Sequence, residues 1–273
     1  MSYTQAENTI RNSLQSTIAI LKESEIEFPE INADTLLAYV LSCDRTILYT
    51  NPDTIINESD ICKYRELINK RANHVPLQYI TRQVEFMSLD FIVDERVLIP
   101  RPETEILVET VLKITDKKQY HDRIITILDI GTGSGNIAVS LAKNLSNVKV
   151  YASDISREAL TIANENVQRH DVIDKIHLLH GNVFDAFNGN VEKGHVDFIV
   201  SNPPYVTETE SKNLEPELRD HEPLLALVAG EDGLCFYKRI IKDAADWLTP
   251  NGYLVIEIGE TQANDINKLL QNK

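Results

Sequence analysis

Cysteine is scarce in this sequence: the 273 residues include three, far apart at Cys43, Cys62 and Cys235. An odd number at such spacing suggests neither a disulfide framework nor a zinc site, which favours a reducing compartment. The seven histidines show no metal-ligand spacing with these cysteines, so no metal is expected. No apolar run approaches the roughly 18 residues of a membrane span, and the N-terminus lacks the apolar core of a signal peptide. We therefore expect a cytoplasmic protein without a membrane partner.

Positive charge is also in short supply. Lys and Arg total 27 against 42 Asp and Glu, which gives a formal net charge of −15 at pH 7. Proteins that bind nucleic acid usually carry a basic face, because neutralising phosphates supplies much of their affinity. A local basic patch can exist within an acidic total, but the balance argues against direct nucleic-acid binding. A basic protein partner, by contrast, would be steered towards this surface.

The first 75 residues carry the periodicity of helices. Apolar residues recur at spacings of three and four in the first of them: Ile10, Leu14, Ile18 and Leu21. Further helices are expected over 33–42 and 59–75, the latter with Ser59 as its cap. No strand pattern interrupts them, so residues 1–75 are predicted to form a small helical-bundle domain. This domain is either a packing appendage or a partner-recognition module.

Strand and helix patterns alternate in the rest of the chain. Strands are expected at 124–130, 148–154, 175–181, 196–202 and 252–259. Near-continuous apolar strands separated by helices indicate an α/β fold, with a parallel sheet covered by helices on both faces. Residues 76–105, between the two regions, are predicted to be a connector that contains a β-hairpin.

A glycine-rich turn follows the first of these strands. It reads Gly131-Thr132-Gly133-Ser134-Gly135, and Asp129 lies just before it. Glycine lets the backbone turn tightly and approach a ligand with no Cβ in the way. The next strand ends at Asp154, where an acid can accept both hydroxyls of an adenosine ribose. Because an acid precedes the turn, S-adenosylmethionine, with its cationic sulfonium and ammonium groups, fits better than a cofactor carrying pyrophosphate.

The fourth strand ends at Asn202-Pro203-Pro204-Tyr205. The prolines fix two φ angles and push Asn202 towards an extended conformation. The Asn202 side-chain oxygen and the Pro203 carbonyl can each accept one N–H from a planar nitrogen, in an amide or an exocyclic amine. The Tyr205 ring can pack against that planar group and exclude water. Because orientation of this kind lowers a reaction barrier, we expect direct in-line methyl transfer, without a metal or a covalent enzyme intermediate.

Over nearly its whole length the sequence resembles the protein-(glutamine-N5) methyltransferases that modify peptide chain release factors. The motifs that carry the likeness occur in the family's order: PLQYI (76–80), EF (85–86), VLIPRPETE (97–105), ILDIGTGSG (127–135), SD (153–154), SNPPYV (201–206), HEP (221–223), AL-x-x-G-x-DGL (226–234) and EIG-x-x-Q (257–262). NPPY alone is shared with adenine-N6 methyltransferases, whereas the LIPRPETE run separates the two families.

The resemblance implies a Rossmann-like class I methyltransferase domain over residues 106–273, which uses S-adenosyl-L-methionine. The N-terminal helical domain would dock the release factor, whose Gly-Gly-Gln glutamine would receive the methyl group on its side-chain amide nitrogen. The implied cofactor-binding residues are Asp129, Gly131, Thr132, Gly133, Ser134, Gly135, Asp154, Asn182, Val183, Asn202 and Thr104. The implied catalytic residues are Asn202, Pro203, Pro204 and Tyr205, which would also bind substrate together with Arg101 and Glu103.

The chain departs from the family's pattern in two places that matter for function. Asn182 and Val183 stand where an acid and an aromatic residue are often found, so stacking on adenine is lost. The final strand pair that the family usually has after residues corresponding to 257–273 is absent, so we expect either a truncated chain or a variant with an exposed sheet edge. Three alternative functions stay open: methylation of a ribosomal-protein glutamine, methylation of adenine in nucleic acid, and cofactor binding without catalysis.

Overall fold

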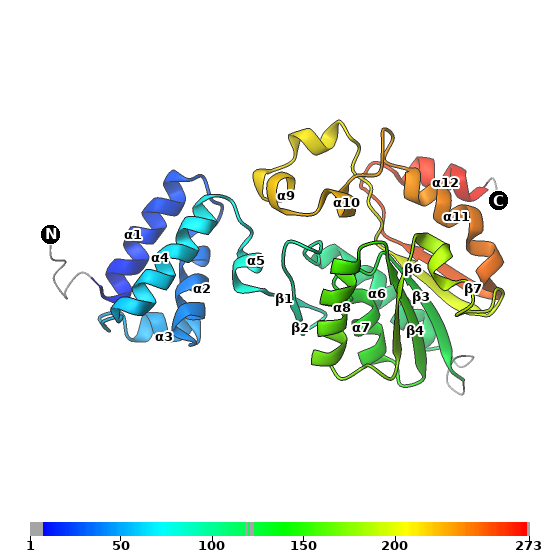
Figure 1. Cartoon of the computed structure of the whole chain (residues 1–273), viewed down its shortest axis with the longest axis horizontal. Coiled ribbons are helices and arrows are strands. Elements are labelled where there is room, and N and C mark those ends of the chain that lie inside the picture. Colours follow the sequence, from blue (N-terminus) through cyan, green and yellow to red (C-terminus); the bar gives the residue numbers. More distant parts are fainter. Residues whose placement is uncertain (1–7, 118–119, 121–122, 272–273) are drawn as a thin grey trace. The chain divides into compact units, whose positions relative to one another are not determined.

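The computed structural model describes residues 8–117, 120 and 123–271, and it contains two compact units (Figure 1). The division falls between Arg82 and Gln83, within the segment expected to be a connector. In the described ranges, no helix is both long enough and apolar enough to cross a membrane.

The first unit consists of helices. They are α1 (Ile10–Glu23), α2 (Pro29–Leu41), α3 (Arg45–Thr50), α4 (Glu58–Ala72) and α5 (Leu77–Thr81). Leu21, Leu36 and Leu37 are fully buried in their shared core. The Tyr64 hydroxyl donates to the Ala33 carbonyl at 3.0 Å, which ties α4 to α2. The predicted helical bundle is thus confirmed, and the short helix α3 is added to it.

The start of α4 differs from the sequence expectation. Asn57 is the cap, since its side-chain oxygen accepts the N–H of Asp60 at 2.9 Å. Ser59, the expected cap, lies inside the helix. Asn and Ser are comparable capping residues, so the local sequence does not distinguish Asn57 from Ser59. The predicted start of this helix, with Ser59 as its cap, is therefore later than the observed one.

The second unit is built on a parallel sheet. Its chain begins with an antiparallel hairpin of β1 (Gln83–Phe86) and β2 (Leu89–Ile92). The main strands are β3 (Ile125–Ile130), β4 (Val148–Asp154), β5 (Ile176–His180), β6 (Val196–Ser201) and β7 (Leu248–Ile256), in the order β5-β4-β3-β6-β7. The helices are α6 (Pro102–Thr115), α7 (Asn136–Asn144), α8 (Arg157–Arg169), α9 (Pro216–His221), α10 (Leu224–Leu227), α11 (Cys235–Trp247), α12 (Ala263–Gln271) and the 3₁₀ turns η3 (Val183–Phe187) and η4 (Glu210–Asn213). The predicted α/β fold is confirmed.

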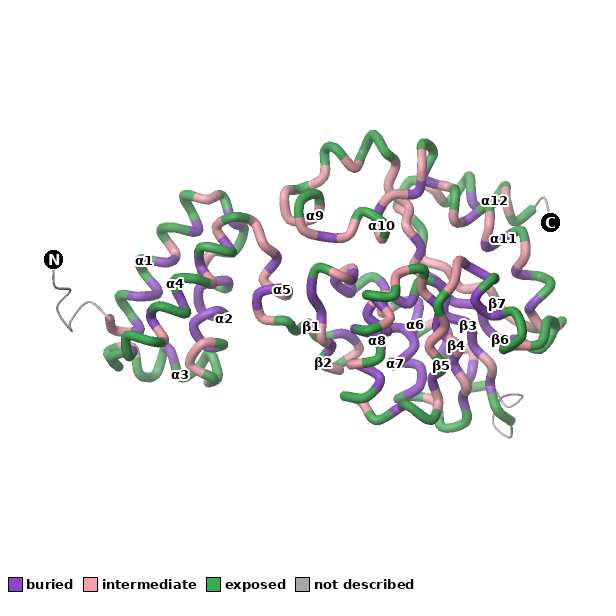
Figure 2. The backbone as a smooth tube through the Cα atoms, viewed as in Figure 1, coloured by how far each residue is buried: buried purple, intermediate pink, exposed green. Residues whose placement is uncertain are grey.

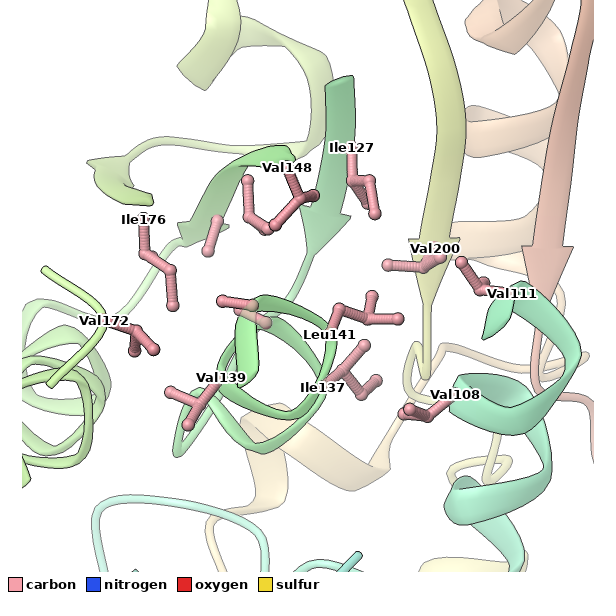
Figure 3. Packing of buried hydrophobic residues seen from close by; sticks show 14 of the residues in the cluster. Val108, Val111, Ile127, Ile137, Val139, Leu141, Val148, Val172, Ile176 and Val200 are labelled. Atoms are coloured by element: carbon pink, nitrogen blue, oxygen red, sulfur yellow. The ribbon is translucent and has the colours of Figure 1, made fainter. Parts of the chain in front are cut away.

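Successive side chains of a strand point to opposite faces of a sheet. In β3 and β6 nearly every residue is buried, so both faces of the sheet are covered. Ile127 of β3 and Val200 of β6 join a core with side chains of α6 and α7 (Figure 3). Leu128 and Ile199, their chain neighbours on the same strands, join a second core with α11 residues, among them Trp247. The central strands are accordingly almost entirely buried in Figure 2.

The strand order changes direction beside β3. The chain passes from β3 to β4 and β5 on one side, and then returns to place β6 on the other side of β3. Asp129 of β3 is in register with Ala152 of β4 and with Val200 of β6. The segments that follow β3 and β6 therefore leave the same edge of the sheet, at a switch point where open α/β sheets bind ligands. Among the described residues, β7 is an edge strand that pairs with β6 alone.

Candidate active site

A cavity of about 220 Å³ lies at the carboxyl ends of the strands. Its wall takes residues from the end of β3, from the end of β4, from the segment after β5 and from the segment after β6. The expected site residues that line it are Gly131, Gly133, Asp154, Asn182, Val183, Asn202, Pro203 and Pro204. The switch point thus coincides with the cavity.

The glycine turn presents bare backbone to this cavity. Gly131 and Gly133 have φ angles of 73° and 54°, which glycine adopts without strain. A Cβ built on either would meet no atom within 4 Å, so the space beside them is open. The turn can therefore hold a ligand against its backbone, and any larger side chain at these positions would occupy that space.

Asp154 is held in place by the turn itself. Its Oδ2 accepts the N–H of Gly133 and its Oδ1 accepts the N–H of Ser156, each at 2.9 Å. Burial raises the pKa of this carboxyl, and the backbone hydrogen bonds partly offset that rise. Each oxygen keeps a lone pair for a further donor, so the fixed carboxyl can accept the two hydroxyls of a ribose.

Asp129 is a fully buried acid with spare acceptor capacity. Its Oδ2 accepts the Thr132 hydroxyl at 2.6 Å, and its Oδ1 has no partner among the described residues. Its pKa is raised to about 7, chiefly by burial; the Thr132 hydroxyl partly offsets this rise, and the nearby Asp154 adds to it. Asp129 does not itself line the cavity, but Ile130, the next residue, does. An uncompensated buried carboxyl beside a nucleoside site fits the positive charge of S-adenosylmethionine.

Replacing Asp129 by asparagine is expected to stabilise the cofactor-free protein at alkaline pH. A carboxyl with a raised folded-state pKa contributes stability below its ordinary pKa, and this is lost as the pH rises through about 7. The stability of the variant relative to the wild type should therefore grow from about pH 5 to about pH 7, by on the order of 1–3 kcal/mol, and change little above that. Urea unfolding of both proteins at the two pH values measures this difference, and a constant difference would contradict it.

Asn202 lies at the cavity wall, as do Gly131 and Gly133 of the glycine turn. The preceding Ser201 is buried, and its hydroxyl donates to the Ile130 carbonyl at 2.7 Å, which joins the ends of β6 and β3. The Asn202 side-chain nitrogen donates to the Thr104 hydroxyl oxygen at 3.1 Å. The amide of Asn202 is thereby fixed through its nitrogen, within reach of whatever fills the cavity.

Tyr205 takes a different position from Asn202. It does not line the cavity, and its side chain packs against a cluster that includes Tyr237, Ile241 and Ile266. Its backbone carbonyl accepts an N–H from the Gln262 side chain at 3.1 Å. In this structure the ring therefore anchors the NPPY segment to α11 and α12.

The RPETE part of the LIPRPETE segment lies outside the cavity wall. Arg101 forms an ion pair with the buried Glu222, which also accepts the N–H of Ile99. Burial raises the pKa of Glu222, while Arg101 lowers it. Glu103 is exposed and Thr104 is buried, and neither they nor Arg101 line the cavity.

The remaining expected residues of the turn, Thr132, Ser134 and Gly135, also stay behind the cavity wall. The wall includes residues that the sequence did not single out: Arg96, Val97, Leu98, Leu225, Ala226, Phe236, Arg239 and Ile240. Val97 and Leu98 belong to the VLIPRPETE motif, so this motif could have identified them as site residues. Arg239 lies on the helix α11, where nothing in the local pattern marks it.

Val183 is unusual among the lining residues. Its φ angle is 51°, a left-handed conformation that β-branched residues rarely adopt. Such strain tends to persist at ligand sites, where the surrounding structure enforces it. This places a strained backbone where the adenine is expected to lie.

Comparison with known proteins shows the family of the chain. Residues 12–81 match the PrmC N-terminal domain and residues 102–218 match the methyltransferase small domain. The chain is 40% identical over 265 residues to the release factor glutamine methyltransferase of Clostridium acetobutylicum, covering 97% of this chain and 90% of that one. It is 39% identical over 258 residues to the protein of the same name in Geobacter sulfurreducens, covering 94% and 87%.

A solved structure agrees with the fold. The hMettl16 catalytic domain in complex with MAT2A 3'UTR hairpin 6 aligns with a TM-score of 0.54 at 16% identity, over 86% of this chain and 83% of that chain. At this identity the likeness concerns the fold alone. The sequence identities over nearly full length decide the family: this chain belongs to the release factor glutamine methyltransferases.

Proposed function

We propose that this enzyme transfers the methyl group of S-adenosylmethionine to the side-chain amide nitrogen of the Gly-Gly-Gln glutamine in peptide chain release factors. The observation that carries the proposal is the placement of Asn202. Its amide stands at the wall of the cavity beside the cofactor turn, with its nitrogen held by Thr104. The side-chain oxygen is thus the group available to accept an N–H from a substrate amide.

The residues of the chain act mainly by positioning. When bound, S-adenosylmethionine supplies a methyl group on a cationic sulfur that a nucleophile can displace. The lone pair of an amide nitrogen is delocalised and attacks poorly. If Asn202 Oδ1 and the Pro203 carbonyl each accept one N–H, the nitrogen is fixed with its face towards the methyl group. The nitrogen would form its bond to the methyl carbon as the carbon–sulfur bond breaks, with the electron pair left on sulfur, and would then release one proton to water.

The buried acids of the site hold the cofactor. Asp154, fixed by two backbone N–H groups, would accept the ribose hydroxyls. Asp129, with its unpartnered oxygen, would balance the positive charge of the methionine part. Gly131 and Gly133 would face the cofactor with bare backbone, and Asn182 and Val183 would border the adenine. None of these residues needs to change its covalent state during the reaction.

The helical unit is proposed to dock the release factor. Its match to the PrmC N-terminal domain supports this role. The unit also exposes large apolar side chains, of which Phe28 and Tyr49 are each more than 60% accessible. Exposed aromatic residues are common at protein interfaces. The formal net charge of −15 also favours a basic protein partner.

The proposal is tested by methyl transfer from labelled S-adenosylmethionine. Purified release factor should take up label, and the same factor with its Gly-Gly-Gln glutamine replaced by alanine should take up none. A ribosomal protein fraction and double-stranded DNA serve as competing substrates. Label in either of these but not in the release factor would overturn the substrate, and tight cofactor binding without any transfer would favour a non-catalytic role.

A further inference from the structure

Two groups outside the cavity wall interact with the Asn202 side chain, the buried Thr104 and the half-buried Glu257. Thr104 lies in the first turn of α6 and Glu257 directly follows β7, whereas Asn202 follows β6. Asn202 lines the cavity, and neither Thr104 nor Glu257 does. Thr104 is 2% exposed. The side chain of Asn202 links these two residues to the cavity wall.

The hydrogen-bond directions in this cluster are fixed by chemistry. With Glu257 ionised, the Thr104 hydroxyl donates its one proton to Glu257 Oε2 at 2.6 Å, because a carboxylate can only accept. The Thr104 oxygen is then free to accept, and it receives an N–H from Asn202 Nδ2 at 3.1 Å. The Asn202 side chain also hydrogen-bonds to Glu257 and lowers its pKa, against the larger upward effect of burial.

Glu257 is itself held rigidly by the backbone around it. Its N–H donates to the Ser201 carbonyl at 3.0 Å, which places it beside the residue that precedes Asn202. Its carbonyl accepts the hydroxyl of the buried Tyr237 at 3.2 Å. The backbone that carries the Glu257 carboxylate is therefore held in place on both sides of its Cα.

This order selects one of the two orientations of the Asn202 amide. The Thr104 oxygen takes an N–H of the amide nitrogen, so the side-chain oxygen is the atom of the amide left to accept from a substrate. Rotation of the amide by half a turn would set its oxygen against the Thr104 oxygen and turn its nitrogen to the cavity. An N–H donor would then meet the N–H of a substrate amide, and no hydrogen bond could form.

We propose that Thr104 and Glu257 are positioning residues, which hold the Asn202 amide with its oxygen towards the substrate nitrogen. The inference rests on the proposed role of Asn202. The family resemblance implied a cofactor contact for Thr104, and the inference gives Thr104 a different role. It also gives a role to Glu257, for which the resemblance implied none.

The test compares Thr104→Val with Thr104→Ser. Valine keeps the volume and removes the hydroxyl, so kcat should fall about tenfold to a hundredfold, the range expected for a hydrogen bond to a charged group. Serine keeps the hydroxyl and should stay within about threefold of the wild type on the same scale. The dissociation constant of S-adenosylmethionine, measured by calorimetry, should change little in both. Thr110→Val, on the exposed side of α6 where that hydroxyl donates to Ile106, is the matched control.

A second background separates positioning from a structural role. Once Asn202 is replaced by alanine, adding Thr104→Val should lower kcat no further, because the group it positions is gone. Glu257→Gln alone should lower kcat in the same range as Thr104→Val, since a carboxamide can also donate and so no longer fixes the order of the cluster. Multiplying effects in the double variant would overturn the inference, as would parallel losses of kcat and cofactor affinity in Thr104→Val.

The outcomes also distinguish this inference from the proposed function. If Asn202→Ala retains full kcat on the release factor, the proposed role of Asn202 fails, and the positioning role fails with it. If Asn202→Ala is slow and Thr104→Val is as fast as the wild type, the role of Asn202 stands and the positioning role alone is overturned.

Discussion

Replacing Asn202 by alanine is expected to lower kcat on the release factor by about 10²–10³-fold, the cost of removing one group that orients or stabilises the reacting centre. The dissociation constant of S-adenosylmethionine should stay within a few-fold of the wild type. The reason is geometric: Asn202 contributes to the cavity wall, but the turn after β3 and Asp154 are the proposed main cofactor contacts. The loss should therefore appear in turnover and not in cofactor binding.

Steady-state kinetics at saturating cofactor, together with calorimetric titration of S-adenosylmethionine, separates the two quantities. Asn213→Ala is a matched control, because Asn213 lies on the same stretch between β6 and α9 and is exposed. Its kcat should equal that of the wild type. Equal losses in turnover and in cofactor affinity for Asn202→Ala would contradict the proposal that Asn202 orients the nucleophilic nitrogen.

Replacing Asp154 by alanine is expected to have the opposite signature. Hydrogen bonds from two ribose hydroxyls to an ionised carboxylate are charge-assisted, so their loss should weaken cofactor binding by about 10²–10³-fold. At saturating cofactor, kcat should fall much less. Asp154→Asn keeps one acceptor oxygen and should have an intermediate affinity. Part of the loss in the alanine variant also comes from the Gly133 N–H, which would lose its acceptor.

Calorimetry on the three proteins, with adenosine as a second ligand, tests this assignment. Adenosine shares the ribose but lacks the methionine part, so its affinity should fall in the same order. Asp174→Ala, an exposed acid just before β5, is the control for the loss of one negative charge. An unchanged affinity in Asp154→Ala would show that this carboxyl does not hold the ribose.

Much of the fold follows from local sequence patterns. The apolar runs of β3 and β6 are buried on both faces, and a parallel sheet between helices is the arrangement that buries them. The positions of Asp129, Asp154 and Asn202 followed from the same reasoning, because each comes at or just after the end of a parallel strand. Strand ends gather at one edge of the sheet, so a local pattern predicted a common location.

Other features depend on contacts between distant parts of the chain. Thr104 and Glu257 are 153 positions apart, and no local pattern brings them together. The Tyr205 ring packs on α11 and α12 and not in the cavity, because apolar partners there bury it. The short helix α3 has too few residues for a periodic signal. In each case tertiary packing decided what the local sequence left open.

The most direct test of methyl transfer to the release-factor glutamine is tandem mass spectrometry of the release factor after incubation with the enzyme and S-adenosylmethionine. We expect one added methyl group on the side-chain nitrogen of the Gly-Gly-Gln glutamine with the wild-type enzyme, and little or none with Asn202→Ala in the same time. A methyl group on a different residue would contradict the proposed substrate atom. Equal methylation by the two enzymes would contradict the role of Asn202.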